Sequence, residues 1–268
     1  MTDLARYLDR IGFKGPTTPT LETLQALHRA HLLAVPYENL DLQFGRTLGT
    51  SPKAAFDKLV VRRRGGWCYE MNGVFAMALE AIGFQVTRIA GGGGRGGAPG
   101  MTGNHLVVLV QLDEPWIADV GFADGPRDPF PVRPHAFTCA GFEFRLEALP
   151  AGAWRLHNHA AGSAPYYDFS LAAADEALLA EVCQRIQTNP ESPKRLNAIV
   201  IRHTPAGLLQ LRGRVLRDIG PDGATERLID SAEEYTALLR DSFDLDLPDA
   251  AALWPRITAR HRALFDPS

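Results

Sequence analysis

One cysteine, Cys68, stands in a context that favours chemistry, the stretch RGGWCYEMN at residues 64–72. Two glycines allow the backbone to turn sharply just before residues 71–82, whose apolar positions follow the helical period. Cys68 therefore falls in the first helical turn, where unpaired N–H groups and the helix dipole stabilise a thiolate and can hold an oxyanion. Arg64 would add positive potential if it pointed at the thiol. Because buried free cysteine is common, this position alone is equally typical of a packing residue.

A cysteine nucleophile requires a base, and the base requires a group that orients it. His105 opens one apolar run, and Asp119 lies inside a second, residues 116–120. A turn between the runs would pair them as a hairpin and place Asp119 opposite residues 105–108. A buried aspartate is costly unless a cation or donor meets it, and His105 is the nearest candidate. The pattern predicts a site of Cys68, His105 and Asp119, and its alternative is a purely structural His–Asp hydrogen bond.

The other chemistry-bearing residues are weaker candidates. Cys139 and Cys183 follow neither a glycine turn nor a helix start, so both are expected to pack in the interior. His157 and His159 are close in sequence, but no third ligand stands nearby and no metal is expected. The three cysteines include no CxxC pair, which argues against a disulfide framework. The glycine-rich stretch 91–103 leads into a strand instead of a helix, which predicts a loop and not a dinucleotide site.

The apolar periodicity places the site between a helical region and a β region. Residues up to 85 follow helical spacing, with helix starts at Thr20 and Ser51 and helix ends at Pro36 and Gly83. The later segments are expected as strands at 85–89, 105–110, 116–120, 136–139, 143–146, 154–157, 166–169, 198–203 and 208–215, and as helices at 175–187, 231–239 and 250–264. Helices, then a mostly antiparallel β region, then a mixed end predict an α+β fold with boundaries 1–85, 86–187 and 188–268.

The composition excludes several classes of function. The chain of 268 residues carries a net charge of −3, whereas nucleic-acid and membrane surfaces call for a basic excess. The one basic run, Arg62–Arg64, is too short to form a binding stripe. No stretch approaches the roughly 20 apolar residues of a membrane helix, and the N-terminus lacks the pattern of a signal peptide. We therefore expect a cytoplasmic protein with no nucleic-acid or membrane partner.

Four motifs, in this order and spacing, resemble those of the arylamine N-acetyltransferases over essentially the full chain. They are YLDRIG at residues 7–12, PYENL at 36–40, RGGxCxExN at 64–72 and DVGF at 119–122, with His105 before an apolar strand. The resemblance implies a papain-like fold with an N-terminal helical bundle, a central β-barrel and a C-terminal α/β lid. It also implies that Cys68, His105 and Asp119 form a Cys-His-Asp triad.

The chemistry that the resemblance implies is ping-pong acyl transfer. Cys68 would take an acetyl or other short acyl group from acetyl-CoA, which acts as a co-substrate without a metal. An arylamine, arylhydrazine or N-arylhydroxylamine would then accept the acyl group. The resemblance also assigns other roles: acceptor contacts to Tyr37 and Phe122, coenzyme contacts to Asn104, Gly121 and Phe122, and support of the triad to Arg64, Glu70 and Asn72.

One departure from the family pattern bears on substrate identity. Lys194 stands where the family often has phenylalanine in an SPF motif, so a cation replaces an aromatic side chain. An amide synthase of the same fold, which closes a macrolactam on a carrier-bound polyketide, would use the same triad. A catalytically silent binding protein on this scaffold is the alternative of another class. The sequence leaves monomer and homodimer both open.

Overall fold

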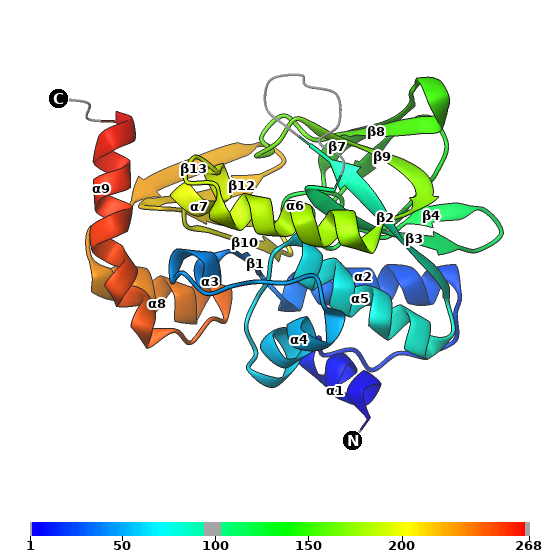
Figure 1. Ribbon diagram of the computed structural model, residues 1–268, viewed down its shortest axis with the longest axis horizontal. Helices are drawn as coiled ribbons and strands as arrows, with labels where there is room; N and C mark the ends of the chain where they lie inside the picture. Colours follow the sequence, from blue (N-terminus) through cyan, green and yellow to red (C-terminus); the bar gives the residue numbers. More distant parts are fainter. Residues whose placement is uncertain (1, 94–102, 266–268) are drawn as a thin grey trace.

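The N-terminal helices lie on one side of the molecule and the strands arch over them (Figure 1). The structure is a computed structural model, and it describes residues 2–93 and 103–265. Most of the glycine-rich stretch for which a loop was expected lies outside these residues. No helix among them has both the length and the apolar character needed to cross a membrane.

The first part of the chain is helical, as predicted. Its elements are α1 (Asp3–Arg10), α2 (Leu21–Ala34), the short strand β1 (Tyr37–Glu38), α3 (Leu40–Gln43), α4 (Pro52–Phe56), a π-helical turn (Asp57–Val61) and α5 (Cys68–Ile82). Thr20 caps α2 by accepting a hydrogen bond from the Thr23 N–H, and Gly83 ends α5 with φ of 105°. Helix α5 carries Cys68 at its first position and packs against the two strands that follow it.

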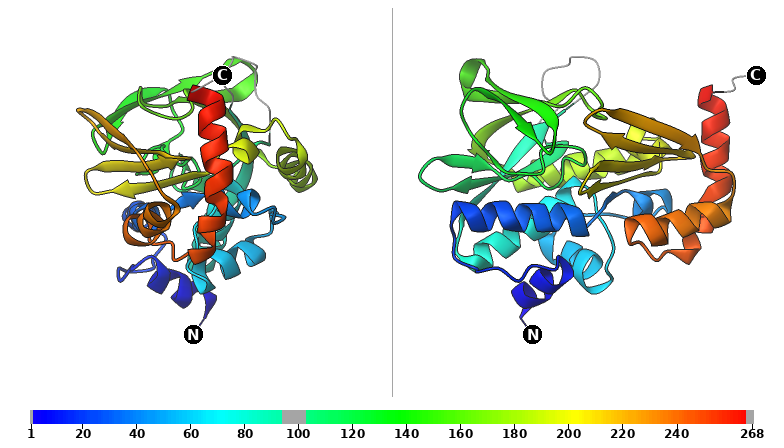
Figure 2. Two further views of the ribbon diagram at one scale, coloured as in Figure 1. Left: turned by 90° about the vertical axis from the view of Figure 1, so that its left-hand side faces the viewer. Right: turned by 180° about the vertical axis from the view of Figure 1, so that it is seen from behind.

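Within the described residues, the central strands form one antiparallel sheet in the order β5-β4-β3-β2-β9-β8-β7-β6. Their bounds are β2 (Gln85–Gly92), β3 (His105–Gln111), β4 (Pro115–Ile117), β5 (Phe130–Pro131), β6 (His135–Cys139), β7 (Phe142–Ala148), β8 (Ala153–His157) and β9 (Tyr166–Ala173). Strands β5 and β6 stand at the two ends of this order, so the sheet is a curled half-barrel and not a closed barrel (Figure 2).

The hairpin that was predicted to bring Asp119 to His105 is present, with one difference. Strand β4 pairs with β3 in the predicted register, Ile117 opposite Leu109, but it ends two residues before Asp119. The backbone turns away there because the Asp119 carboxylate accepts hydrogen bonds from the N–H groups of Gly121 and Phe122. Asp119 therefore sits in a side-chain-stabilised turn and not inside a strand.

The last part of the chain adds a second antiparallel sheet, ordered β1-β10-β11-β12-β13 in the described residues. Its elements are α6 (Glu176–Thr188), α7 (Pro193–Leu196), β10 (Ile199–Thr204), β11 (Gly207–Arg212), β12 (Val215–Gly220), β13 (Gly223–Leu228), α8 (Ala232–Phe243), a 3-10 helix (Pro248–Leu253) and α9 (Trp254–Phe265). The predicted single strand 208–215 was wrong, because Gly213 turns the chain there with φ of 59°. The polar strand β13 was not predicted at all.

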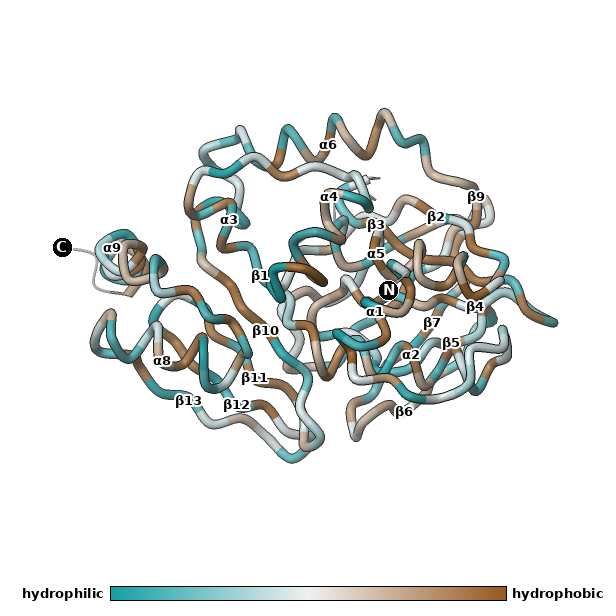
Figure 3. The backbone as a smooth tube through the Cα atoms, turned by 90° about the horizontal axis from the view of Figure 1, so that it is seen from below, coloured by the Kyte–Doolittle hydropathy of each residue, from teal (hydrophilic) through white to brown (hydrophobic). Residues whose placement is uncertain are grey.

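Contacts between distant segments hold these parts together. Strand β1 pairs with β10, and one apolar cluster joins Trp67 of the N-terminal region to Leu106 of the central sheet and Ile201 of β10. Helix α6 alternates hydrophilic and hydrophobic residues along its length and buries Leu179 and Cys183 (Figure 3). The division at 85/86 and 187/188 stays a prediction, since these contacts cross both boundaries.

Five charged side chains lie buried between β1, α3, the π-helical turn and α5. This buried charge cluster consists of Glu38, Asp41, Lys58, Arg64 and Glu70. The ammonium of Lys58 lies 2.9 Å from a Glu70 oxygen, 3.1 Å from Asp41 and 3.5 Å from Glu38. Glu70 in turn accepts a hydrogen bond from the Trp67 N–H at 3.1 Å, so the cluster fixes the chain at the start of α5.

We predict that Lys58→Met strongly destabilises the protein, because three buried carboxylates would share one remaining buried cation. The expected loss is about 3–5 kcal/mol of unfolding free energy, measured by urea denaturation. The control is Lys53→Met, which removes an exposed lysine of α4 and should change stability by less than about 0.5 kcal/mol. Equal stability of the two variants would contradict the role given to the cluster.

Candidate active site

The backbone before Cys68 is held so closely that only glycine fits. A Cβ on Gly65 would lie 2.2 Å from the carbonyl oxygen of Pro36, and one on Gly66 would lie 2.9 Å from the Glu70 side chain. The Gly66 carbonyl accepts a hydrogen bond from the Glu38 N–H at 2.9 Å, which fastens this turn to β1. The two glycines thus allow α5 to begin at Cys68, where the positive end of the helix dipole favours an anion.

The structure brings Cys68, His105 and Asp119 into one buried, hydrogen-bonded group. His105 Nε2 lies 2.7 Å from Asp119 Oδ2, which leaves Nδ1 for the hydrogen bond between His105 and Cys68. Phe122 and Tyr167 contact the imidazole edge-on or tilted, with ring centroids 5.8 and 4.9 Å away. These rings restrict the orientation of the imidazole and keep water from it.

The Asp119 carboxylate is fully engaged. Its Oδ1 accepts hydrogen bonds from Asn72 Nδ2 at 2.7 Å, Gly121 N–H at 3.0 Å and Phe122 N–H at 3.1 Å. Asn72, one turn after Cys68 on α5, also accepts the Val120 N–H at 2.9 Å through Oδ1. Its amide therefore links α5, which carries Cys68, to the turn that carries the aspartate, which gives a physical basis for the supporting position predicted for it.

Charge determines the protonation of the group. Burial disfavours the Asp119 anion, but His105 and the amide donors outweigh burial and lower its pKa. Burial likewise disfavours imidazolium, yet Asp119 raises the pKa of His105 to about 9. Burial opposes ionisation of Cys68, while Lys194 and His105 together lower its pKa to about 7. Both shifts act in the same direction, because they favour the thiolate form of Cys68 together with the imidazolium form of His105.

The cation beside the thiol is Lys194 and not Arg64. Arg64 is buried in the charge cluster, where its Nη2 lies 2.7 Å from Glu38 and 3.2 Å from Asp41. The condition set for Arg64, that it point at the thiol, is therefore not met, and these two carboxylates match its charge. Lys194 Nζ lies 3.8 Å from Cys68 Sγ, although in the sequence this residue stands out only as a departure from the family pattern.

The remaining predicted residues also lie around the thiol. The Asn104 carbonyl is 3.9 Å from Cys68 Sγ, and its side chain exchanges two hydrogen bonds with the Gly93 backbone at 2.8 and 3.0 Å. Gly121 packs on α5 so tightly that a Cβ would lie 2.8 Å from Cys68 Cα. Tyr37 is buried and hydrogen-bonded to Lys194.

Sequence reasoning missed Tyr167, which is buried near Asp119 and packs on both His105 and Phe122. Its signal was present in β9, where Tyr167 and Phe169 point inward at a spacing of two. Burial raises the pKa of Cys139 to about 11 and of Cys183 to about 12, so both thiols stay protonated, in keeping with packing roles.

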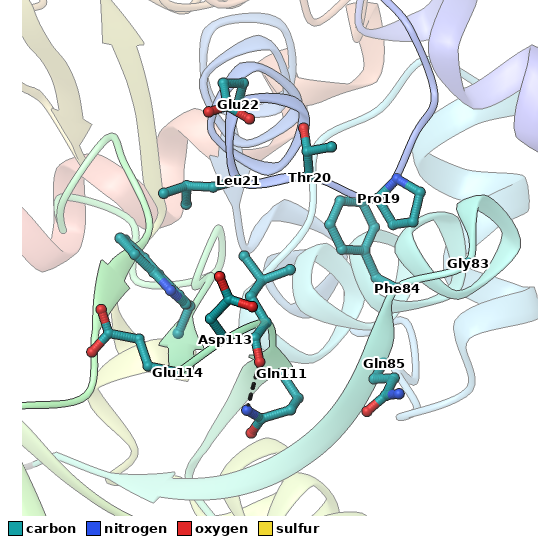
Figure 4. Close-up of a pocket in the computed structure, with 12 residues that line it drawn as sticks. Pro19, Thr20, Leu21, Glu22, Gly83, Phe84, Gln85, Gln111, Asp113 and Glu114 are labelled. Carbon is teal, nitrogen blue, oxygen red and sulfur yellow. Dashed lines mark hydrogen bonds between the residues drawn. The ribbon is translucent and has the colours of Figure 1, made fainter.

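Other features of the described residues do not compete with this site. His157 bonds Glu147 at 2.7 Å and His159 bonds the Asp124 carbonyl at 3.0 Å, and in residues 2–93 and 103–265 no cluster of histidine, cysteine and acidic side chains suits a metal. A cavity of about 690 Å³ opens between α2, the α5–β2 turn and the β3–β4 hairpin, where Phe84 and Asp113 line it (Figure 4). None of its lining residues belongs to the group around Cys68.

Comparison with known proteins assigns the chain to a family. Residues 20–252 match the family model described as N-acetyltransferase. The arylamine N-acetyltransferase of Mycolicibacterium smegmatis is 34% identical over 93% of this chain and 94% of its own length. The Mycobacterium marinum arylamine N-acetyltransferase, solved in complex with CoA, superposes with a TM-score of 0.85 at 30% identity, covering 96% of this chain and 97% of that one.

A second kind of relative matches a shorter part. The proansamycin X synthase of Amycolatopsis mediterranei is 35% identical, over 56% of this chain and 60% of its own length. The family model covers residues 20–252, and the Mycolicibacterium smegmatis arylamine N-acetyltransferase aligns over almost its whole length, so both matches are longer than the match to the synthase. This chain belongs to the arylamine N-acetyltransferase family.

Proposed function

We propose that the protein is an acyl-CoA-dependent arylamine N-acetyltransferase that carries the acyl group as a thioester on Cys68. The observation that supports this most strongly is the thiol at the start of α5, hydrogen-bonded to His105, which is in turn bonded to Asp119 at 2.7 Å. This arrangement, similar to that of papain-like cysteine enzymes, populates a thiolate near neutral pH, and a thiolate is the form that attacks a thioester.

The first half-reaction exchanges one thioester for another. The Cys68 sulfur forms a bond to the acyl carbon, the bond from that carbon to the CoA sulfur breaks, and His105 donates its proton to the leaving thiolate. The dipole of α5 favours the negative charge that develops on the acyl oxygen. Because the two thioesters are nearly equal in energy, this exchange is nearly balanced and requires no further input of energy.

The second half-reaction transfers the acyl group to the acceptor. A neutral arylamine, arylhydrazine or N-arylhydroxylamine attacks the Cys68 thioester through its nitrogen or, in the hydroxylamine, its oxygen. His105 accepts the proton that the attacking atom loses, and the thiolate leaves. Asp119 keeps the imidazole in one orientation and stabilises its charged form. Weakly basic aromatic amines suit this step, since they are already neutral at the pH at which the thiolate exists.

The contacts assigned to the two substrates follow the geometry around the thiol. We place the acceptor ring against Tyr37 and Phe122, and the coenzyme along Asn104, Gly121 and Phe122. Phe122 packs on His105, while the backbone of Asn104 and Gly121 contacts Cys68. A substrate group bound at either place is therefore adjacent to the sulfur.

The amide-synthase alternative uses the same thiol but a different donor and acceptor. The match to proansamycin X synthase supports it over part of the chain only. A catalytically silent binding protein does not require a buried carboxylate, imidazole and thiol in one hydrogen-bonded group, so this arrangement favours an enzyme. Free acyl-CoA as the donor separates the transferase from the synthase, which would load only from a carrier protein.

We predict that incubation with acetyl-CoA adds one acetyl group to Cys68, detected by intact mass, and that an aniline or hydrazine acceptor removes it. Cys68→Ser should form no thioester adduct, whereas Cys139→Ser and Cys183→Ser should form it as the unmodified protein does. If no acyl-CoA donor yields an adduct, the transferase function is wrong. Equal loss in all three variants would mean that Cys68 has been misidentified.

We predict that Asp119→Asn slows acyl transfer by about 10³-fold or more, because the amide neither stabilises imidazolium nor fixes the tautomer of His105. The thiol pKa should rise, so alkylation of Cys68 by iodoacetamide at neutral pH should also slow. Circular dichroism controls for folding. Alkylation at the rate of the unmodified protein would count against the role of Asp119.

A further inference from the structure

We propose that Lys194 is a fourth catalytic residue, whose ammonium shares with His105 the task of holding the Cys68 thiolate. This inference rests on the proposed thiol chemistry and adds to it a group on the C-terminal part of the chain. No bond to lysine forms or breaks: the thiol proton passes to His105, and Lys194 keeps its three protons throughout.

The ammonium of Lys194 has three close neighbours, one of which is the Cys68 sulfur. Lys194 Nζ lies 3.8 Å from Cys68 Sγ and 5.4 Å from the centre of the Trp67 ring, and it hydrogen-bonds the Tyr37 side chain. An aromatic face and a hydroxyl stabilise a cation without neutralising it. Cys68 is therefore the neighbour that can carry the matching negative charge.

The backbone that carries Lys194 is held firmly in place. Its carbonyl accepts hydrogen bonds from Asn39 Nδ2 at 2.7 Å and Gln43 Nε2 at 2.9 Å, and the same two amides bond the Asn197 carbonyl. Asn39 Oδ1 also accepts the Ile199 N–H at 2.8 Å. The short helix α7 is thus fastened to the loop after β1, so Lys194 is held near the thiol, unlike a mobile surface lysine.

Lys194 differs in this respect from the buried lysine of the charge cluster. Lys58 contacts three carboxylates within 3.5 Å. Among the described residues, the largest influences on the charge of Lys194 come from Cys68 and Tyr37. The charge of Lys58 is neutralised in place, whereas that of Lys194 is directed at the sulfur.

The other titratable groups around Lys194 and Cys68 leave Lys194 as the dominant cation at the thiol. Burial raises the pKa of Tyr37, of Tyr69 on α5 and of Cys183 on α6, so all three stay neutral near pH 7. Asp124 acts on Tyr37, and His105 acts on the thiol from β3. Burial alone would discharge Lys194, but Cys68 and Tyr37 raise its pKa, so it remains charged.

The test is the pH dependence of Cys68 alkylation by iodoacetamide, followed by intact mass on the protein without substrates. The rate should rise with a midpoint near the thiol pKa of about 7. Lys194→Met, similar in length but uncharged, should raise this midpoint by about one unit and slow alkylation at pH 6 about tenfold. Lys194→Arg should keep the midpoint close to that of the unmodified protein, because arginine keeps the positive charge. Lys53→Met removes an exposed lysine and should not move the midpoint.

A midpoint unchanged in Lys194→Met, with circular dichroism unchanged, would overturn the proposal. If the methionine variant does not fold, Lys194→Gln takes its place, and the same two outcomes apply. Failure of the proposed function is distinguishable, because it is read from acetyl-CoA labelling and not from alkylation. If no acetyl adduct forms but the midpoint shifts in Lys194→Met, the transferase function is rejected and the role of Lys194 is kept. If the adduct forms but the midpoint does not shift, only the role of Lys194 is rejected.

Discussion

The structure around the site depends on burying one ionised carboxylate, Asp119. A buried carboxylate without partners would cost several kcal/mol or become protonated. It avoids both because donors reach it from α5 through Asn72, from β3 through His105, and from its own turn through two backbone N–H groups. Satisfying that charge also fixes the helix that carries Cys68 relative to the half-barrel, so one electrostatic requirement sets the geometry of the thiol and its base.

The buried cations near the site have two different structural roles. Lys58 and Arg64 are matched by Glu38, Asp41 and Glu70, and their contribution is to fix the glycine turn before α5. Lys194 contacts the sulfur itself, at 3.8 Å. The proximity of a cation in sequence is therefore a poor guide to its electrostatic effect: Arg64 stands four positions before the thiol and is neutralised, while Lys194 is 126 positions away and acts on it.

Much of this arrangement was predictable from the sequence, and the exceptions have physical causes. The glycine turn, the helix start at Cys68 and the β3–β4 register follow from local rules, because glycine conformation and apolar periodicity are short-range properties. Strand β13 was missed because every one of its residues is exposed, so it has no apolar alternation. The places of Arg64 and Lys194 depend on partners such as Glu38 and Asn39, whose positions are set by the β1–β10 pairing. A single sequence contains no local signal of that pairing.

The central claim is that Cys68 and His105 exist as a thiolate–imidazolium pair, and NMR of the imidazole nitrogens tests it most directly. The His105 signals can be identified among those of the eight histidines, because they are missing from the spectrum of His105→Gln. At about pH 8, between the pKa of about 7 for Cys68 and about 9 for His105, the imidazole should carry both protons. In Cys68→Ser it should lose one of them at a lower pH, because the anion that supports its charge is gone. A neutral His105 at that pH in the unmodified protein, or a titration unaffected by Cys68→Ser, would contradict the account.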